Sequence, residues 1–466
     1  MTTQSHKGVW ISIFAGCLVI WWASHSGAAN ISEFVNITPY VEIEGIYDDN
    51  VFELSEDARL PEDAEEREDF IFNTGAGVGV DINLERPYLK LGVGVDYGFT
   101  YSKYANNTEQ DDVEHSLNFD LNFLSKYEKG IVRDRVKFNV RDVLSLIPID
   151  EEEPLLSGNR VLRNRFDVGL DYKLISTRRI ALTLGYAYGR TDYENASIKV
   201  DTVADQYSKS DDLTQESQIH SGKADFQYIL NPKLTYVASY TYQFSDREEN
   251  PGELVSADFF RHNILSGIQA KLTPRIHANF QAGYTLTSYE DIGSLSQEDQ
   301  DNFVVEASVT ANFARQPLMT VGYRRYYTEN DFGDTLLTDN VFGRMGIKVT
   351  KELLVNLSAD YILEDRDLFD DETNQLLLGV NTEYEVLKNI TLLIGYNYRD
   401  KEFFEQNFLA ERERNETTHT FSGGLQYQVA RYVLLKGMYY YTDKTSDIAD
   451  QEYNRNQFIA SGRVIF

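Results

Sequence analysis

The sequence is poor in cysteine, proline and positive charge. Cys17 is the only cysteine and lies in the first segment, which excludes disulfides and thiol chemistry from the rest of the chain. Lysine and arginine number 44 against 74 aspartates and glutamates, for a formal net charge of −30. This balance argues against a nucleic-acid partner, because phosphates require a basic surface. Proline occurs only 9 times, whereas tyrosine and phenylalanine, which suit half-buried strands, occur 31 and 26 times.

Long hydrophobic runs are also scarce. Mean hydropathy is −0.41, and only Val9 to Ala23 forms an extended apolar stretch. This stretch is shorter than the roughly 20 residues of a membrane-spanning helix. It follows Lys7 and precedes the small residues Gly27-Ala28-Ala29. We therefore expect a cleaved export signal over residues 1–29 and a mature domain over residues 30–466. An uncleaved transmembrane anchor is the alternative.

The remaining chain is dominated by a two-residue alternation of apolar and polar side chains. Phe70 to Leu84 and Tyr88 to Tyr101 are the clearest cases, separated only by Glu85-Arg86-Pro87. Alternation of this kind predicts strands with one apolar and one polar face. Because each such strand averages to a neutral hydropathy, a low overall value is compatible with a membrane barrel.

The alternation recurs in a unit of about 40 residues: a strand, a tight turn, a second strand and a long polar loop. Propeller blades fit four short strands into a similar length, whereas strands of about 10 residues match a tilted transmembrane strand. We predict an all-β fold, a transmembrane antiparallel up-and-down β-barrel of about 20 strands (18–22). Its tight turns should be periplasmic, and its acidic loops extracellular. Asp48 to Asp69 has 11 acidic residues and is expected to sit in water.

The C-terminus carries a second alternating pattern. It resembles the signal by which the barrel assembly machinery recognises outer-membrane proteins, and it consists of Phe458, Ala460, Gly462, Val464 and Phe466. The match is partial, since that signal usually has its glycine one residue earlier and a tyrosine in place of Val464. An ordinary final strand is the alternative.

A basic stripe is the most unusual feature in so acidic a protein. The stripe consists of the residues expected to line the lumen, which are Arg133, Arg135, Lys137, Arg141, Arg163 and Arg165. The first four alternate with apolar residues, so we expect them to face the lumen and to guide an anionic solute. Alternatively, they pair with carboxylates across the lumen. The intervening segment Leu144 to Leu162 is expected to be an apolar loop, which either constricts the lumen or packs on the rim.

Basic and histidine side chains also fall at positions facing away from the lumen. Arg190 and Arg325 lie among outer aromatics and are candidates for contact with lipopolysaccharide phosphates. Four histidines begin descending strands and are expected at the rim: His115, His220, His262 and His419. No companion acid or nucleophile indicates an enzyme. No cofactor is expected, and no metal site either, since the loop carboxylates lack EF-hand spacing.

The segment Pro39 to Phe52 contains Asp49-Asn50-Val51-Phe52 after a predicted strand. It resembles the opening of the putative β-barrel porin 2 family, and the hairpin repeat fits that family over nearly all of the mature chain. The resemblance implies an integral protein of the bacterial outer membrane that passes polysaccharide or another hydrophilic solute. It also implies an exopolysaccharide or capsule export system, with an export protein and its polymer as partners. The alternatives are a surface or adhesion barrel with a blocked lumen and, last, an outer-membrane enzyme.

Overall fold

The computed structural model describes most of the chain after residue 33. The predicted signal, residues 1–29, and two residues of the basic stripe, Arg133 and Arg135, lie outside it. No helix within the described part is long and apolar enough to cross a membrane. The described residues are 34–55, 66–86, 89–125, 136–148, 160–194, 217–247, 258–290, 299–313, 318–329, 335–366, 371–407, 410–447 and 452–466.

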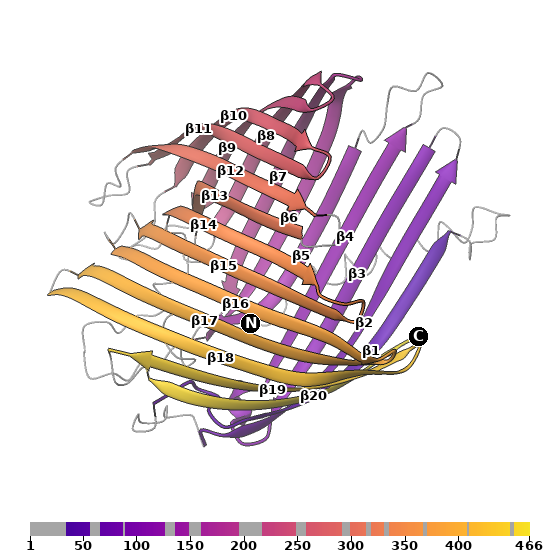
Figure 1. Cartoon of the computed structure of the whole chain (residues 1–466), viewed down its shortest axis with the longest axis vertical. Coiled ribbons are helices and arrows are strands. Elements are labelled where there is room, and N and C mark those ends of the chain that lie inside the picture. Colours follow the sequence, from indigo (N-terminus) through magenta and orange to yellow (C-terminus); the bar gives the residue numbers. More distant parts are fainter. Residues whose placement is uncertain are drawn as a thin grey trace.

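Twenty strands form one sheet, in which each strand pairs with the next along the chain (Figure 1). All the pairings are antiparallel. The strands are β1 (Val35–Asp48), β2 (Asp69–Arg86), β3 (Leu89–Tyr104), β4 (Asp112–Ser125), β5 (Val136–Pro148), β6 (Arg160–Ser176), β7 (Ile180–Glu194), β8 (Ser217–Asn231), β9 (Leu234–Arg247), β10 (Phe259–Thr273), β11 (Ile276–Tyr289), β12 (Gln300–Asn312), β13 (Leu318–Glu329), β14 (Thr335–Lys348), β15 (Leu353–Arg366), β16 (Asp371–Leu387), β17 (Ile390–Asn407), β18 (Ala410–Ala430), β19 (Val433–Ser446) and β20 (Tyr453–Ile465).

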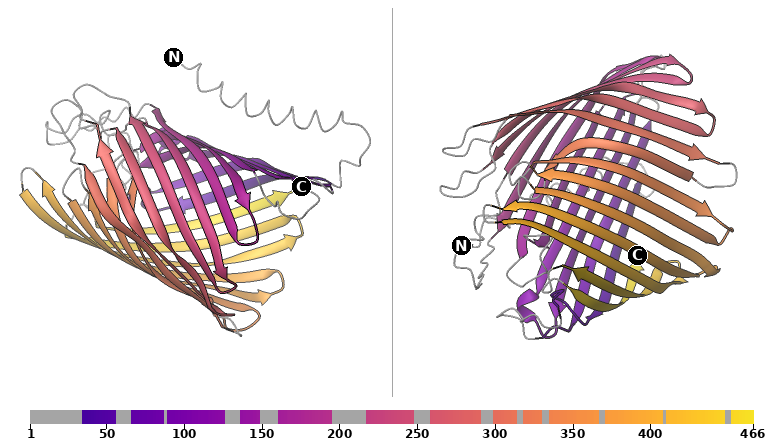
Figure 2. Two further views of the ribbon diagram at one scale, coloured as in Figure 1. Left: turned by 90° about the horizontal axis from the view of Figure 1, so that it is seen from above. Right: turned by 60° about the vertical axis from the view of Figure 1, so that its left-hand side comes forward.

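The first and last strands close the sheet into a barrel. β1 pairs with β2 on one side and with β20 on the other, in a register running from Tyr40 opposite Ile465 to Asp48 opposite Gln457. The strands are tilted and wrap around the barrel, as Figure 2 shows from two directions. Closure leaves no unpaired sheet edge. The predicted antiparallel barrel of about 20 strands is confirmed.

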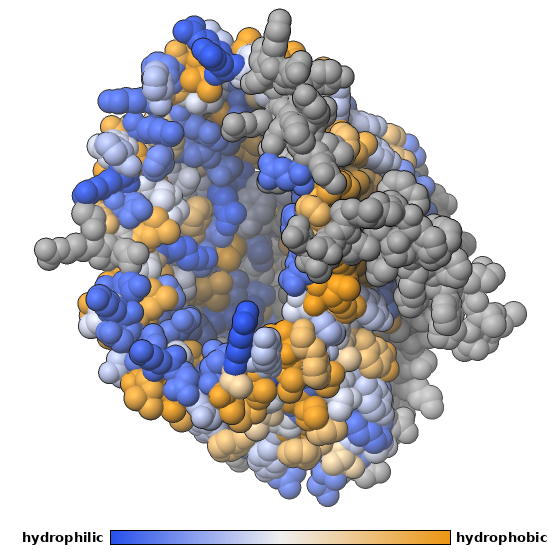
Figure 3. All heavy atoms as spheres, turned by 90° about the vertical axis from the view of Figure 1, so that its right-hand side faces the viewer, coloured by the Kyte–Doolittle hydropathy of each residue, from blue (hydrophilic) through white to orange (hydrophobic). Residues whose placement is uncertain are grey.

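The alternation in the sequence separates an apolar outer face from a polar inner face. In β1, the exposed side chains include Ile37, Val41 and Ile43, while Glu42 and Glu44 point to the opposite face. Since residues directly opposite in neighbouring strands share a face, this assignment extends around the barrel. Figure 3 shows a recess lined mainly by hydrophilic residues, with hydrophobic residues covering the outside below it.

Side-chain hydrogen bonds shape the tight turns. The Asn231 carboxamide oxygen accepts the Lys233 N–H at 2.8 Å, and the Thr177 hydroxyl oxygen accepts the Ile180 N–H at 2.9 Å. Short polar side chains stabilise turns in this way. Register shifts occur beside several tight turns, for instance between Lys271 and Thr273 at the end of β10. The extra residue of such a bulge bends the strand into the turn.

Two expectations about the loops are wrong. The segment Leu144 to Leu162 is not wholly a loop, because β5 continues to Pro148 and β6 begins at Arg160, with Leu146 opposite Leu162. Similarly, a long loop does not follow every odd-numbered strand, since β17 and β18 pair up to Asn407 opposite Ala410. In both hairpins, the backbone groups bond across the pair and the strands therefore extend further than expected.

Candidate channel lining

The predicted basic stripe lies on the inner face where the structure describes it. In β5, Phe138 contacts the Phe119 ring at 6.3 Å between centroids and lies opposite Leu170, which is exposed on the outer face. Lys137 and Arg141 alternate with this apolar set and therefore face the lumen. Arg163 and Arg165 of β6 share that face, since Asp167 lies opposite Arg141.

Carboxylates lie among these basic side chains. Arg165 Nε is 3.1 Å from Asp167 Oδ2, and Lys223 of β8 is 2.8 Å from Asp171 through its Nζ. Lys137 lies opposite Asp171 in the register. These pairs are partly exposed, so each contributes little to stability. They nevertheless reduce the positive potential that the stripe presents to a solute.

The lumen wall formed by β1 to β4 has the opposite character. Many of its inward positions are acidic or glycine, and amide and hydroxyl side chains lie among them. The acidic ones are Glu42, Glu44, Asp81, Asp96 and Asp120, and the glycines are Gly75, Gly77, Gly79, Gly92, Gly94 and Gly98. The glycines leave open space between the other side chains of this wall, and its carboxylates favour cations nearby. The lumen is therefore divided into walls of different charge.

Tyr40 lies across the glycine wall near the closing strands. A Cβ atom on Gly77 would come within 2.4 Å of the Tyr40 ring, and one on Gly98 within 2.8 Å of its hydroxyl. The Arg463 guanidinium lies 4.0 Å from the centre of the same ring. Glycine at both positions therefore leaves the space that the ring occupies, and the cation–π contact adds a link between β20 and β1.

The other end of the β1–β20 junction is held by a cluster around a buried carboxylate, here called the seam clamp (Asp48, Glu53, Arg455 and Gln457). Arg455 donates to Asp48 from Nε at 3.0 Å to both carboxylate oxygens and from Nη2 at 2.5 Å. Its Nη1 donates to Glu53. Gln457 donates to Asp48 at 2.7 Å. Asp48 is fully buried, so these bonds replace its lost hydration.

The residues following the seam clamp are folded inward. Asp69 is also buried, and its carboxylate accepts hydrogen bonds from the backbone N–H groups of Phe70, Ala105, Asn106 and Asn107. A small apolar core packs beside it, made of Val51, Phe52, Leu54, Ile71 and Tyr104. The expectation that Asp48 to Asp69 sits entirely in water is therefore wrong at both its ends. Each buried carboxylate has enough donors to be buried.

Sequence reasoning missed the seam clamp, although the segment that forms it was noticed. Within that segment, Asn50 donates to the Leu54 carbonyl at 2.8 Å and accepts the Leu54 N–H at 3.1 Å. Glu53 has φ 56°, a left-handed conformation that is strained for such a residue. The signal available in the sequence was an asparagine followed by Val51 and Phe52 inside an acidic run.

The lipopolysaccharide candidates lie on the outer face, each beside an aspartate. Arg190 Nε is 2.6 Å from Asp192, and Arg325 Nη1 is 3.2 Å from Asp339. The four predicted histidines share this face; His115 lies beside the Tyr97 ring, and the other three bond to tyrosines. These contacts join the Nδ1 atoms of His220, His262 and His419 to the hydroxyls of Tyr186, Tyr240 and Tyr396 at 2.7, 2.9 and 3.0 Å.

The C-terminal pattern lies in the closing strand. Phe458 and Phe466 are exposed on the outer face, with Gly462 and Val464 between them. Val464 lies opposite Val41, and the Phe466 N–H donates to the Pro39 carbonyl at 2.9 Å. These residues thus complete the pairing of β20 with β1. Their role as an assembly signal stays a prediction.

Comparison with known proteins finds a family model that matches part of this chain and several solved structures with a similar fold. The family model for Putative beta-barrel porin 2 matches residues 373–466, and no curated protein matches the sequence. FpvAI in its complex with pyocin S2 is 10% identical, with 92% of this chain and 70% of that chain covered and a TM-score of 0.52. OccAB4 of Acinetobacter baumannii is 11% identical, with 94% and 100% covered and a TM-score of 0.42. A BenF-like porin of Pseudomonas fluorescens Pf-5 is 9% identical, with 92% and 99% covered and a TM-score of 0.42.

A closed barrel with an apolar outside, together with the family match, defines this protein as a porin-like outer-membrane β-barrel. Over β16 to β20 it matches the putative β-barrel porin 2 family, which confirms the resemblance. The match does not include residues 39–52, where the sequence motif lies.

Proposed function

We propose that the barrel is an aqueous channel through which a hydrophilic solute crosses the outer membrane, and that this solute is a polysaccharide being exported. The polar inner face of a closed barrel carries the proposal, because a solute in the lumen would meet charged, amide and hydroxyl groups on every wall. Barrels of about this strand number lie between open porins and plugged transporters. The family resemblance supports polysaccharide as the solute, with an export protein as the periplasmic partner.

Channel activity is tested by reconstitution of the purified mature barrel into planar bilayers. We expect discrete conductance steps, and swelling of proteoliposomes in neutral sugars. The absence of both in correctly folded protein would contradict the channel and favour the adhesion barrel with a blocked lumen. Deletion of the gene in its host should separately reduce surface polysaccharide while polymer accumulates in the periplasm.

The basic stripe has a second test, because it has two possible roles. Replacement of Lys137, Arg141, Arg163 and Arg165 by Gln should shift the reversal potential toward cation selectivity if these residues face the solute. If they mainly neutralise Asp167 and Asp171, the same variant should leave the reversal potential unchanged and lower the melting temperature only slightly, because these pairs are partly exposed. Both measurements are made on one preparation.

Contact with the surrounding membrane is part of the proposal. Arg190 and Arg325 face outward, where the lipopolysaccharide phosphates of the outer leaflet would approach. Since each already has an aspartate neighbour, we expect a shared contact. Replacement of both by Gln should reduce the lipopolysaccharide that copurifies with the barrel, and an unchanged amount would contradict the contact.

A further inference from the structure

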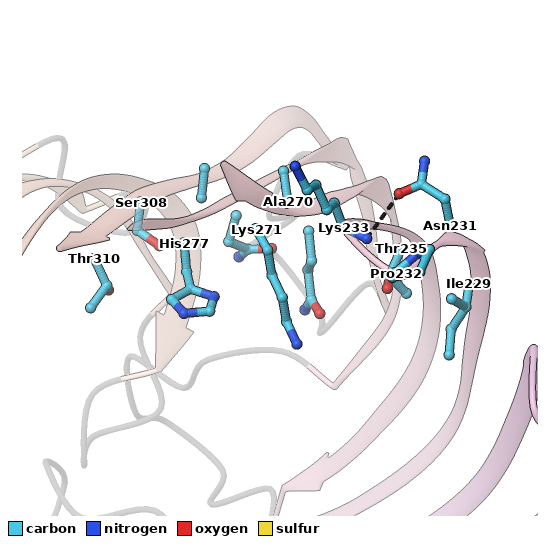
Figure 4. Close-up of a pocket in the computed structure, with 13 residues that line it drawn as sticks. Ile229, Asn231, Pro232, Lys233, Thr235, Ala270, Lys271, His277, Ser308 and Thr310 are labelled. Carbon is cyan, nitrogen blue, oxygen red and sulfur yellow. Dashed lines mark hydrogen bonds between the residues drawn. The ribbon is translucent and has the colours of Figure 1, made fainter. Parts of the chain in front are cut away.

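A pocket lies on the inner face of β8 to β12, beside the tight turns that join β8 to β9 and β10 to β11, away from the stripe that the sequence singled out. Its volume is about 350 Å³, within the range of small-ligand sites. Lys233, Lys271 and His277 supply its basic groups. Figure 4 shows Lys271 and His277 with side chains directed to the same side of the strands.

The register explains why these groups meet. His277 of β11 lies opposite Lys271 of β10 and opposite Thr310 of β12. One row further from the turns, Gln269 and Asn279 lie opposite each other, flanked by Thr235 and Ser308. Directly opposite side chains have Cβ atoms about 5 Å apart. Two adjacent rows of donors therefore face one space.

The lining contains no carboxylate, which distinguishes the pocket from several other basic positions of the lumen. Arg165, Lys223 and Arg344 each contact an aspartate. In contrast, no ion pair involves Lys233 or Lys271 within the described ranges of the chain. An anion entering the pocket would therefore meet cations that have no competing carboxylate among their pocket neighbours.

We propose that this pocket binds carboxylate-bearing saccharide units at the short-turn mouth of the barrel. The inference rests on the proposed channel and narrows its solute to an anionic one. The Lys271 ammonium and a ring N–H of His277 would bind the carboxylate. The amides and hydroxyls of Gln269, Asn279, Ser308 and Thr310 would bond the sugar hydroxyls. No phenylalanine, tyrosine or tryptophan lines the pocket, so recognition depends mainly on charge and hydrogen bonds. The alternation of turns and loops predicts that this mouth is periplasmic, where an exported polymer would enter.

The test uses oligogalacturonate as the anionic probe and maltohexaose as the neutral one, added to the short-turn side of single channels. Wild-type current should be blocked by oligogalacturonate at concentrations where maltohexaose has no effect. In the variant Lys271→Gln with His277→Gln, half-block should require at least about tenfold more oligogalacturonate, because the lysine charge and the histidine hydrogen bond are both lost. Lys436→Gln is the matched control, a lumen-facing lysine of β19 outside the pocket, and it should behave as wild type.

Equal block of wild type and double variant, or equal block by both sugars, would overturn the inference while leaving the channel intact. A wild-type barrel that does not conduct would instead contradict the proposed function. In that case, calorimetric titration of the folded barrel with trigalacturonate tests separately whether the pocket binds an anionic saccharide. Binding weakened by the double variant and unaffected by Lys436→Gln supports it, and unchanged binding refutes it. The two single variants repeat the measurement if the double variant does not fold.

Discussion

Removal of the Arg455 guanidinium should destabilise the barrel strongly at the β1–β20 junction. In Arg455→Gln, the Asp48 carboxylate would keep the Asn50 N–H at 3.1 Å and the Gln457 amide at 2.7 Å. It would lose its only cation among the contacts that the structure describes. A buried carboxylate without a countercharge is far more costly than the bonds alone suggest.

The magnitude follows from burial. Breaking a buried ion pair by removal of one partner costs about 3–5 kcal/mol. The Asp48 side chain is 0% exposed, but that of Arg455 is 18% exposed, so some water reaches the guanidinium. We therefore expect a loss of about 3 kcal/mol in the free energy of unfolding. The double change Asp48→Asn with Arg455→Gln should lose less, because no lone carboxylate is left at Asp48.

Urea unfolding in phospholipid vesicles measures these differences, followed by far-UV circular dichroism and heat-modifiable gel migration. The three tryptophans all precede residue 30, so tryptophan fluorescence would not report on the barrel strands. Arg431→Gln, an exposed arginine in a tight turn, is the control and should change stability by less than about 0.5 kcal/mol. If Arg455→Gln matches this control, the seam clamp does not stabilise the junction and the reasoning fails.

Three other outcomes are expected. Gly77→Ala should destabilise the barrel by about 1–3 kcal/mol because its Cβ would overlap the Tyr40 ring. The control Gly423→Ala, whose Cβ would have nothing within 4 Å, should be nearly neutral. Equal melting temperatures of the two variants would contradict the position of the ring. Deletion of Phe466 should reduce the heat-modifiable form while export across the inner membrane continues, and normal barrel levels would mean that the ending is only a strand. For Asp111, burial acts to raise the pKa, but hydrogen bonds from Lys103 and the Tyr104 N–H outweigh it and hold the pKa below its usual value. An aspartate with a lowered pKa in the folded state stabilises the fold at pH values above the unfolded pKa of about 3.9, and this stabilisation is lost as the pH falls through the folded pKa. The melting temperature of Asp111→Asn should therefore depend less on pH below about 5. A pH profile identical to that of the wild type would refute this.

The strands were predictable because the two-residue alternation of apolar and polar side chains indicates directly which side chains face the lipid. The predicted strand Phe70 to Leu84 corresponds to β2 (Asp69–Arg86), and the same period places Lys137 and Arg141 on the inner face. The period carries no information about what strand ends meet, so the burial of Asp48 against Arg455, 407 residues away, was not predictable.

The carboxylate-free pocket escaped prediction for a related reason. Its residues are single polar positions on several strands, and each looks like an ordinary lumen residue in its own strand. Only the register between strands brings Lys271 beside His277. Two basic residues flanking one tight turn were the available signal, and many turns of this chain have such flanks.

The pairing of β1 with β20 also determines the order in which the molecule can form. Every other strand pair joins chain neighbours, so most of the sheet can grow hairpin by hairpin, whereas Asp48 must wait for Gln457, 409 residues later in the chain. The entropic cost of closing a loop rises by only about 0.6 kcal/mol for each doubling of its length. The pairing of β1 with β20 is therefore delayed because β20 is the last strand in the chain, and not because closing the barrel costs much free energy. Until β20 arrives, two open edges are exposed to other chains. A nascent barrel therefore needs protection for as long as its last strand is missing.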